Sequence, residues 1–233
     1  MFDVESKSPG RPTALVTGAS SGLGAAFARV FAGHGYDLIL VARDGERLAA
    51  LQAELRERFA ASAHLIVKDL ALENSPAEIY AEVRARSITL DVLVNNAGLI
   101  GYGKFHQTDL ARELEMIRVN LLALTVLTKL FLPEMVSRGR GKILNLGSTG
   151  SFAASPLNAV YSATKAYIRS FSEAIAEELD GTGITVTALC PGAVHTELQK
   201  RGGMEDVRLL QRGVLEAQDV AEQGYRALMA GKR

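Results

Sequence analysis

Three side chains that could move a proton and polarise a carbonyl group lie in the second half of the chain: Ser148, Tyr161 and Lys165. Tyr161 and Lys165 are four residues apart in an expected helix, so they share one helical face. A phenol has a reference pKa of about 10 and must be shifted to exchange protons near neutrality. A neighbouring ammonium would lower that pKa by stabilising the phenolate. Tyr-x-x-x-Lys alone occurs on many surface helices, so the other motifs in the chain must decide whether this one is functional.

Ser148 adds a hydroxyl donor at the end of an expected strand, 13 residues before Tyr161. From there it could donate a hydrogen bond to a substrate carbonyl oxygen. The three residues together therefore predict acid–base chemistry between a carbonyl and an alcohol.

A glycine-rich loop follows the first expected strand, reading TGASSGLG over residues 17–24. Glycines let the backbone approach a pyrophosphate, and the following helix N-terminus offers free N–H groups. Its G-x-x-x-G-x-G spacing differs from the more common G-x-G-x-x-G fingerprint, and glycine turns also occur without a ligand. We expect the cofactor contacts of this loop to be Gly18, Ser20, Ser21, Gly22, Leu23 and Gly24.

The end of the second expected strand, Val41-Ala42-Arg43, bears on the choice of dinucleotide. Ala42 stands where an NAD-binding protein usually carries an acid for the ribose 2′-hydroxyl. The Arg43 guanidinium would suit a 2′-phosphate by charge and by its fork of donors. Asp44 either pairs with Arg43 or caps the next helix, and Arg43 itself could simply be a solvated charge. NADP(H) is therefore favoured over NAD.

Short apolar strands alternate with amphipathic helices along the chain, which predicts an α/β fold with a doubly wound, mostly parallel, Rossmann-like sheet covered by helices on both faces. Residues 1–11 are expected to form a loose leader and residues 12–233 a single catalytic and dinucleotide-binding domain. The expected strands are Thr13–Thr17, Tyr36–Ala42, Ala63–Val67, Asp91–Asn95, Lys142–Gly147 and Ile184–Leu189. The expected long helices are Asp44–Phe59, Thr108–Val136 and Ala159–Leu179, with a last helix near Ala217.

Composition narrows the class of protein. Of 233 residues, 26 are Lys or Arg and 26 are Asp or Glu, so the chain lacks the basic excess of a dedicated nucleic-acid binder. The single cysteine, Cys190, excludes an internal disulfide and a cysteine-based zinc site, and we expect no metal. A polar start without an apolar signal core and an apolar run of 14 residues, Val119–Leu132, favour a cytoplasmic protein without a membrane span.

The motifs occur in a fixed order: Thr17–Gly24, Asn95–Gly98, Asn120, Ser148, Tyr161, Lys165 and Pro191-Gly192. Together they resemble the short-chain dehydrogenase/reductase family over about residues 12 to 230. The resemblance implies NADP(H)-dependent interconversion of a carbonyl and a secondary alcohol on a small-molecule substrate. Tyr161 would be the general acid and base, and Ser148 would orient the substrate.

The resemblance also implies roles for residues around them. Lys165 would bind the nicotinamide ribose and lower the Tyr161 pKa, and Asn120 would anchor a water chain to the lysine. Asp69, with Leu70 beside it, would meet the adenine. Further cofactor contacts would come from Asn95, Ala97, Gly98, Pro191, Gly192, Val194 and Thr196.

The chain departs from the family pattern at its C-terminus, which stops where a seventh strand would begin. We therefore expect the final strand to be missing, the sixth strand to be an exposed edge, and a homodimer through the two long helices Thr108–Val136 and Ala159–Leu179 rather than a tetramer.

One other function remains open from sequence, and a second is excluded by length. A nucleotide-sensing or scaffold protein could keep the fold without turnover, although Ser148, Tyr161 and Lys165 are all present. A sugar-nucleotide epimerase would need a second lobe for which 233 residues leave no room. Ile100, Tyr102, Phe152, Leu157 and Val194 could form an apolar wall, which favours a fairly apolar substrate.

Overall fold

Six parallel strands form one sheet in the computed structural model, which describes residues 10–197 and 214–233. The strand order is β3-β2-β1-β4-β5-β6, and every neighbouring pair is parallel. The strands are β1 (Thr13–Thr17), β2 (Asp37–Ala42), β3 (Ala63–Val67), β4 (Val92–Asn95), β5 (Gly141–Leu146) and β6 (Ile184–Leu189). The chain builds outwards from β1 in one direction and from β4 in the other, so the predicted doubly wound sheet is confirmed.

Continuous apolar strands bury both faces of the sheet. Successive side chains of a strand point to opposite faces, so Leu15 and Leu93 enter one core while Val16 and Val94 enter the other. All four side chains are fully buried. Runs without polar alternation therefore require helices on both sides, as parallel sheets do.

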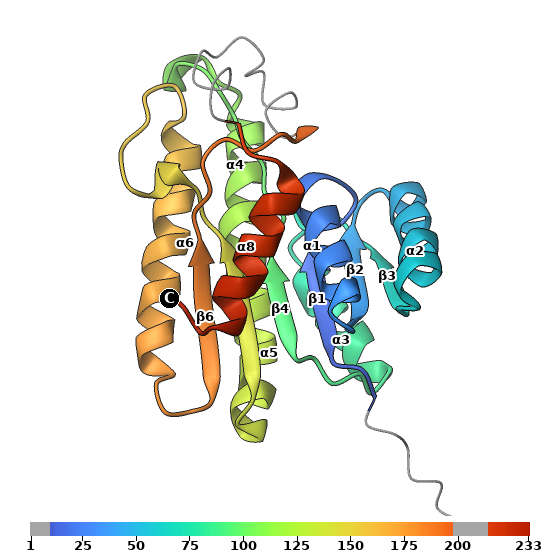
Figure 1. Cartoon of the computed structure of the whole chain (residues 1–233). Helices are drawn as coiled ribbons and strands as arrows, with labels where there is room; N and C mark the ends of the chain where they lie inside the picture. The colour runs from blue at the N-terminus through green and yellow to red at the C-terminus, as the bar shows by residue number, and fades with distance from the viewer. Residues whose placement is uncertain (1–9, 198–213) are drawn as a thin grey trace, which may run out of the picture.

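Helices cover the two faces in separate layers (Figure 1). One core packs under α1 (Gly22–Gly33), α2 (Gly45–Phe59) and α8 (Ala217–Met229). The other lies under α3 (Ser75–Ala85), α5 (Leu124–Arg138) and α6 (Ala159–Glu178). Phe27 and Phe31 on α1 and Leu127 on α5 are among the largest fully buried side chains.

The predicted helix Thr108–Val136 is continuous but not uniform. It consists of α4 (Leu110–Ile117), a π-helical segment Arg118–Ala123, and α5. A π segment holds an extra residue in its turn and is often found at functional sites. Here it carries Asn120. The α3 helix was not expected from the sequence, although Pro76 in its first turn is a helix-start signal.

Both ends of the described chain make contacts with the rest of the fold. Residues 1–9 of the predicted leader lie outside the described residues, but Arg11 is anchored. Its guanidinium donates to the carbonyl oxygens of Gly35 and Ala60 at 3.1 and 2.5 Å. At the other end, the Thr187 hydroxyl of edge strand β6 donates to the carbonyl oxygen of Lys232 at 2.6 Å. The C-terminal residues thus lie against the edge strand.

One helical stretch, Leu110–Arg138, passes a test of length and hydropathy for crossing a membrane. Core helices of soluble proteins pass the same test, and Leu127, Phe131 and Met135 of this stretch are buried in the core. The apolar character of the helix is therefore explained in part by packing against the sheet.

Candidate active site

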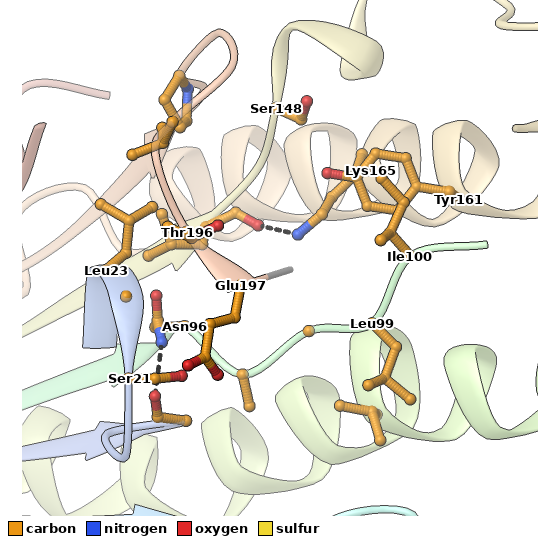
Figure 2. A pocket seen from close by; sticks show the side chains of 18 of the residues that line it. Ser21, Leu23, Asn96, Leu99, Ile100, Ser148, Tyr161, Lys165, Thr196 and Glu197 are labelled. Carbon is orange, nitrogen blue, oxygen red and sulfur yellow. Dashed lines mark hydrogen bonds between the residues drawn. The ribbon is translucent and has the colours of Figure 1, made fainter. Parts of the chain in front are cut away.

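A cavity of about 650 Å³ lies at the carboxyl ends of the strands, where open parallel sheets bind ligands. It is bordered by the loops that follow β1, β2, β3, β4, β5 and β6 and by the start of α6. Of the residues predicted from sequence, those that line it are Gly18, Ser20, Ser21, Gly22, Leu23, Arg43, Asp69, Leu70, Ala97, Gly98, Ser148, Tyr161, Lys165, Pro191, Gly192, Val194 and Thr196. Figure 2 shows Tyr161 and Lys165 on one side of this cavity and Ser21 and Leu23 on another.

The glycine loop has a backbone that only small residues permit. Gly18 and Gly22 have φ values of +67° and +54°, in the left-handed region that favours glycine. Gly24 does not line the cavity, and its predicted contact with the cofactor stays a prediction. A Cβ atom at Gly24 would lie 2.1 Å from the Gly18 carbonyl oxygen, so this glycine lets α1 begin directly against the loop. The loop and the helix N-terminus together leave a cradle suited to a pyrophosphate.

The Asn95 side chain also lies outside the cavity, and its predicted contact with the cofactor stays a prediction. Asn95 is buried, and its amide nitrogen donates to Thr128 Oγ1 at 3.0 Å and to Asn145 Oδ1 at 2.9 Å. Asn145 in turn donates to Ser172 Oγ on α6 at 2.9 Å. Asn95 therefore joins β4, β5, α5 and α6 beneath the site.

Asn96, the next residue, lines the cavity in its place and was missed. Its amide nitrogen donates to the Thr17 carbonyl oxygen at 2.8 Å, and Thr17 Oγ1 accepts hydrogen bonds from the backbone N–H groups of Asn96 and Ala97. These bonds fasten the end of β4 to the start of the glycine loop. The alternation of strand side chains could have separated the two asparagines, since Asn95 shares the parity of buried Leu93.

Asn120 is buried and does not line the cavity, and its hydrogen bonds position neighbouring elements of the site. Its predicted catalytic role stays a prediction. Its Oδ1 accepts from the Leu99 backbone N–H at 2.8 Å, and its Nδ2 donates to the Leu99 carbonyl oxygen and to Thr164 Oγ1, each at 3.0 Å. Thr164 donates to the Tyr161 carbonyl oxygen at 2.7 Å. The π segment thus ties the loop after β4 to the helical turn that carries Tyr161.

Lys165 is a buried cation held by the backbone. Its Nζ donates to the Leu146 carbonyl oxygen at 2.7 Å, at the end of β5. A Cβ atom at Gly98 would be in ordinary van der Waals contact with this Nζ, at 3.7 Å, and with Asn120 Oδ1, at 3.4 Å, so Gly98 lies directly beside both groups. Burial lowers the Lys165 pKa to about 8, because the charged form loses its solvation.

The Tyr161 pKa differs from the prediction made from spacing. Burial raises it above its ordinary value, and a hydrogen bond with the Ser148 hydroxyl acts in the opposite direction. The Lys165 Nζ lies 5.7 Å from the Tyr161 ring centroid and donates to the Leu146 carbonyl oxygen, and burial is the larger influence, so the phenol pKa stays above its ordinary value in this arrangement. Four-residue spacing placed the two residues on one face correctly but did not determine where the ammonium points.

Ser148 is fixed by the short 3₁₀ turn Thr149–Ser151 that follows it. The Ser148 hydroxyl accepts from the Gly150 backbone N–H at 3.1 Å, while the Ser151 hydroxyl accepts from the Ser148 backbone N–H at 3.2 Å. This reciprocal capping box holds the hydroxyl at the cavity wall. One of its two lone pairs accepts from Gly150, and its proton is left for Tyr161 or a substrate.

Arg43 lies between two acids at the opposite end of the cavity. Its Nη1 is 3.6 Å from Asp69 Oδ2 and 3.3 Å from Glu115 Oε1. Asp44 takes the second of its two predicted roles, since its side chain accepts from the Arg47 backbone N–H and caps α2. An arginine with half its side chain exposed, beside a glycine loop, can receive a phosphate.

The predicted apolar wall is only partly formed. Ile100 and Val194 line the cavity, whereas Tyr102, Phe152 and Leu157 are exposed outside it. The Phe152 ring packs against the Arg169 guanidinium, 4.5 Å from ring centroid to carbon. Further lining residues that the sequence reasoning missed include Asp44, Lys68, Leu99, Val119, Ser155, Asn158 and Glu197.

Other residues considered from sequence fall outside the cavity. His195 does not line it, and its backbone N–H donates to the Leu215 carbonyl oxygen. Within residues 10–197 and 214–233, no group of three His, Cys, Asp or Glu side chains could hold a metal ion.

Comparisons with known proteins agree with this site. A family model described as short chain dehydrogenase matches residues 12–205. The NADP-dependent 3-hydroxy acid dehydrogenase of Salmonella typhi is 41% identical over 184 residues, covering 77% of this chain and 71% of that protein. Sulfoacetaldehyde reductase 2 of Chromohalobacter salexigens is 37% identical over 215 residues, covering 89% and 84%.

Among solved structures, a short-chain dehydrogenase from Sphingobium yanoikuyae in complex with NADPH superposes with a TM-score of 0.89 at 35% identity, covering 95% of this chain and 85% of that one. The glycine cradle, the Ser148, Tyr161 and Lys165 side chains and the parallel sheet occur here in one arrangement. The chain belongs to the short-chain dehydrogenase/reductase family of oxidoreductases.

Proposed function

We propose that this protein uses NADP(H) to interconvert a carbonyl and a secondary alcohol on a small, fairly apolar substrate. The observation that carries the proposal is one cavity that holds a glycine cradle and Arg43 at one end and Ser148, Tyr161 and Lys165 at the other. The relatives named above include one that is NADP-dependent and one solved with NADPH. Arg43 in place of an acid at the end of β2 supports the same cofactor.

The protein's own groups suit carbonyl reduction. The Ser148 hydroxyl would donate a hydrogen bond to the substrate carbonyl oxygen, stabilising the charge that develops there. NADPH, when bound, supplies the hydride that the carbonyl carbon accepts. The Tyr161 hydroxyl would give its proton to the oxygen, completing the alcohol, and the phenolate would regain a proton from solvent. Because burial raises the Tyr161 pKa, the phenol holds its proton near neutrality and is ready to act as the acid.

The substrate preference rests on the cavity walls. Part of the cavity wall is apolar and is formed by Leu99, Ile100 and Val194. Two polar side chains, those of Ser155 and Asn158, also line the cavity. Such a mixture suits an apolar ketone or alcohol with a hydrogen-bonding group near the reacting carbon. The non-catalytic alternative from sequence has no support, because every group of the proposed reaction lies in one cavity.

The two long helices support the homodimer predicted from sequence. Leu114, Leu122, Val126 and Tyr167 are exposed on α4, the π segment, α5 and α6, and we name them the apolar helix face. The Thr125 and Tyr167 hydroxyls lie 2.9 Å apart and join its two helices. A second copy placed by a two-fold axis would bury this face against itself.

Substitutions at the two ends of the cavity separate the proposed chemistry from the proposed cofactor. Tyr161→Phe is expected to lower the turnover of an apolar ketone by at least about 100-fold while NADPH still binds, because it removes only the proton donor. Arg43→Ala is expected to weaken NADPH about tenfold and to leave NADH nearly unchanged, since only NADPH carries the 2′-phosphate. Steady-state rates and fluorescence titrations measure the two effects. Full turnover by the Tyr161→Phe variant would refute Tyr161 as the acid.

Burial of the Lys165 ammonium is expected to lower the stability of the folded protein. The Lys165 pKa is about 8 in the folded protein against 10.5 as its ordinary value, so the unfolded chain binds more protons between these pH values. Stability contributed by this residue is therefore lowest below pH 8 and rises as pH increases towards 10.5. Lys165→Met should be inactive, yet about 1–3 kcal/mol more stable than the wild type at pH 7, with a smaller gain at about pH 9.5.

Urea unfolding of both proteins at the two pH values measures this difference. A methionine variant that is less stable than the wild type at pH 7, or a gain that is the same at both pH values, would contradict the cost assigned to the buried ammonium.

The dimer proposal predicts that charge on the apolar helix face separates the subunits. Leu122→Lys should convert a particle of twice the chain mass into a monomer, because two buried ammonium groups would face each other across the two-fold axis. Light scattering after size exclusion measures the mass. Leu72→Lys, at a similarly exposed residue between β3 and α3, is the matched control and should leave the mass unchanged. A wild-type monomer would refute the proposal.

A further inference from the structure

A glycine lines the cavity directly beside the two hydroxyl groups of the proposed reaction. Gly150 is the middle residue of the 3₁₀ turn that follows Ser148. A Cβ atom at Gly150 would lie 3.6 Å from Ser148 Oγ and 3.9 Å from Tyr161 Cε1, the ring carbon next to the one that bears the hydroxyl. The position of the missing side chain is therefore adjacent to both groups that would hold a carbonyl oxygen.

Neither the backbone nor the packing requires a glycine at this position. The φ angle of Gly150 is not in the left-handed region that favours glycine. Its backbone N–H donates to Ser148 Oγ at 3.1 Å, and every residue except proline has such a donor. The third neighbour of a Cβ atom there would be Ser162 Cβ at 4.0 Å, so all three contacts are at ordinary van der Waals distances. The turn itself could accept a larger residue.

Gly147, three residues earlier, is different. It also lines the cavity, but a Cβ atom there would lie 2.5 Å from Cys190 Sγ, which is closer than two such atoms can approach. Packing between the end of β5 and the segment after β6 therefore requires glycine at 147. The fold explains Gly147, whereas Gly150 is left to be explained by what enters the cavity.

The side-chain position at Gly150 bears on both the size and the configuration of a substrate. When a carbonyl oxygen accepts from Ser148 and Tyr161, one of the two substituents on the carbonyl carbon lies on the side of Gly150. A hydride that arrives from one fixed direction reaches only one face of that carbon. Exchanging the two substituents between the two sides therefore gives the mirror-image alcohol.

We propose that Gly150 is a specificity-determining residue, and that the space left by its missing side chain receives the larger substituent of a ketone. The substrate class is then ketones, and the matching secondary alcohols, that carry an aromatic ring or a branched alkyl group on one side of the reacting carbon. The inference rests on the proposed function and deepens it, since it concerns the same cavity and the same reaction.

Two ketones that differ in one substituent test this assignment. Acetone has two methyl groups, and acetophenone has a phenyl ring in place of one of them. Gly150→Val should lower kcat/KM for acetophenone at least about tenfold and leave that for acetone nearly unchanged, because even one extra methylene in a filled pocket costs about tenfold or more. Gly150→Ala adds only the Cβ atom and should give a smaller loss. The enantiomer of 1-phenylethanol that the wild type forms in excess should lose that excess, or be replaced by the other, in the valine variant.

Gly33→Ala is the matched control. A Cβ atom at Gly33 would lie 3.6 and 3.9 Å from atoms of the Phe59 ring, which are the contact distances found at Gly150. Gly33 is the last residue of α1 and does not line the cavity. Its substitution should leave both rates and the ratio of enantiomers unchanged.

Calorimetric titration of acetophenone into the full chain saturated with NADP⁺ needs no turnover, because no hydride is available. A wild type that binds acetophenone more tightly than Gly150→Val does, but reduces no ketone with NADPH, would support the space at Gly150 and overturn the proposed reaction. A wild type that neither binds nor reduces either ketone would overturn both.

The remaining outcomes concern Gly150 alone. If the wild type reduces ketones, equal losses for acetone and acetophenone in Gly150→Val would show that glycine serves only the geometry of the turn, and would refute the assignment. An unchanged rate with acetophenone, or an unchanged ratio of enantiomers, would refute it as well. A wild type that reduces acetone but not acetophenone would also contradict it.

Discussion

The buried ammonium group of Lys165 is the constraint on which the site depends. A cation removed from water must be hydrogen-bonded, and Lys165 is held by the carbonyl oxygen of Leu146 at the end of β5. Gly98, in the loop after β4, lies directly beside it. The chain therefore brings β4, β5 and α6 together around one charge. The sheet supplies the rigid frame that makes this burial possible.

Polar side chains beneath and beside the cavity maintain that arrangement. Asn95 and Asn145 link the central strands to α5 and α6, and Asn120 links the loop after β4 to the turn that carries Tyr161. None of these three asparagines lines the cavity. Their value lies in holding the reacting groups in one geometry, which is how preorganised sites lower a barrier. The π segment at Asn120 gives that side chain its place without breaking the helix.

The sheet was predictable because its strands are unbroken apolar runs, which only a doubly covered parallel sheet can bury. Each strand was placed within one residue of its observed bounds at either end. The α3 helix was missed because its apolar periodicity is short. Which of two adjacent asparagines lines the cavity depends on the parity of β4, and reading the motif alone gave Asn95 where the structure has Asn96. Contacts between distant residues, such as Arg43 with Glu115, have no local signal in the sequence.

The central claim is that the chain transfers a hydride between NADP(H) and a carbonyl carbon. The most direct measurement uses NADPH carrying deuterium in its transferable position, a panel of apolar ketones, and mass spectrometry of the products. The account predicts an alcohol that has gained one deuterium on its carbinol carbon. Binding of NADPH with no labelled alcohol from any ketone in the panel would contradict it and would favour a nucleotide-binding protein without turnover.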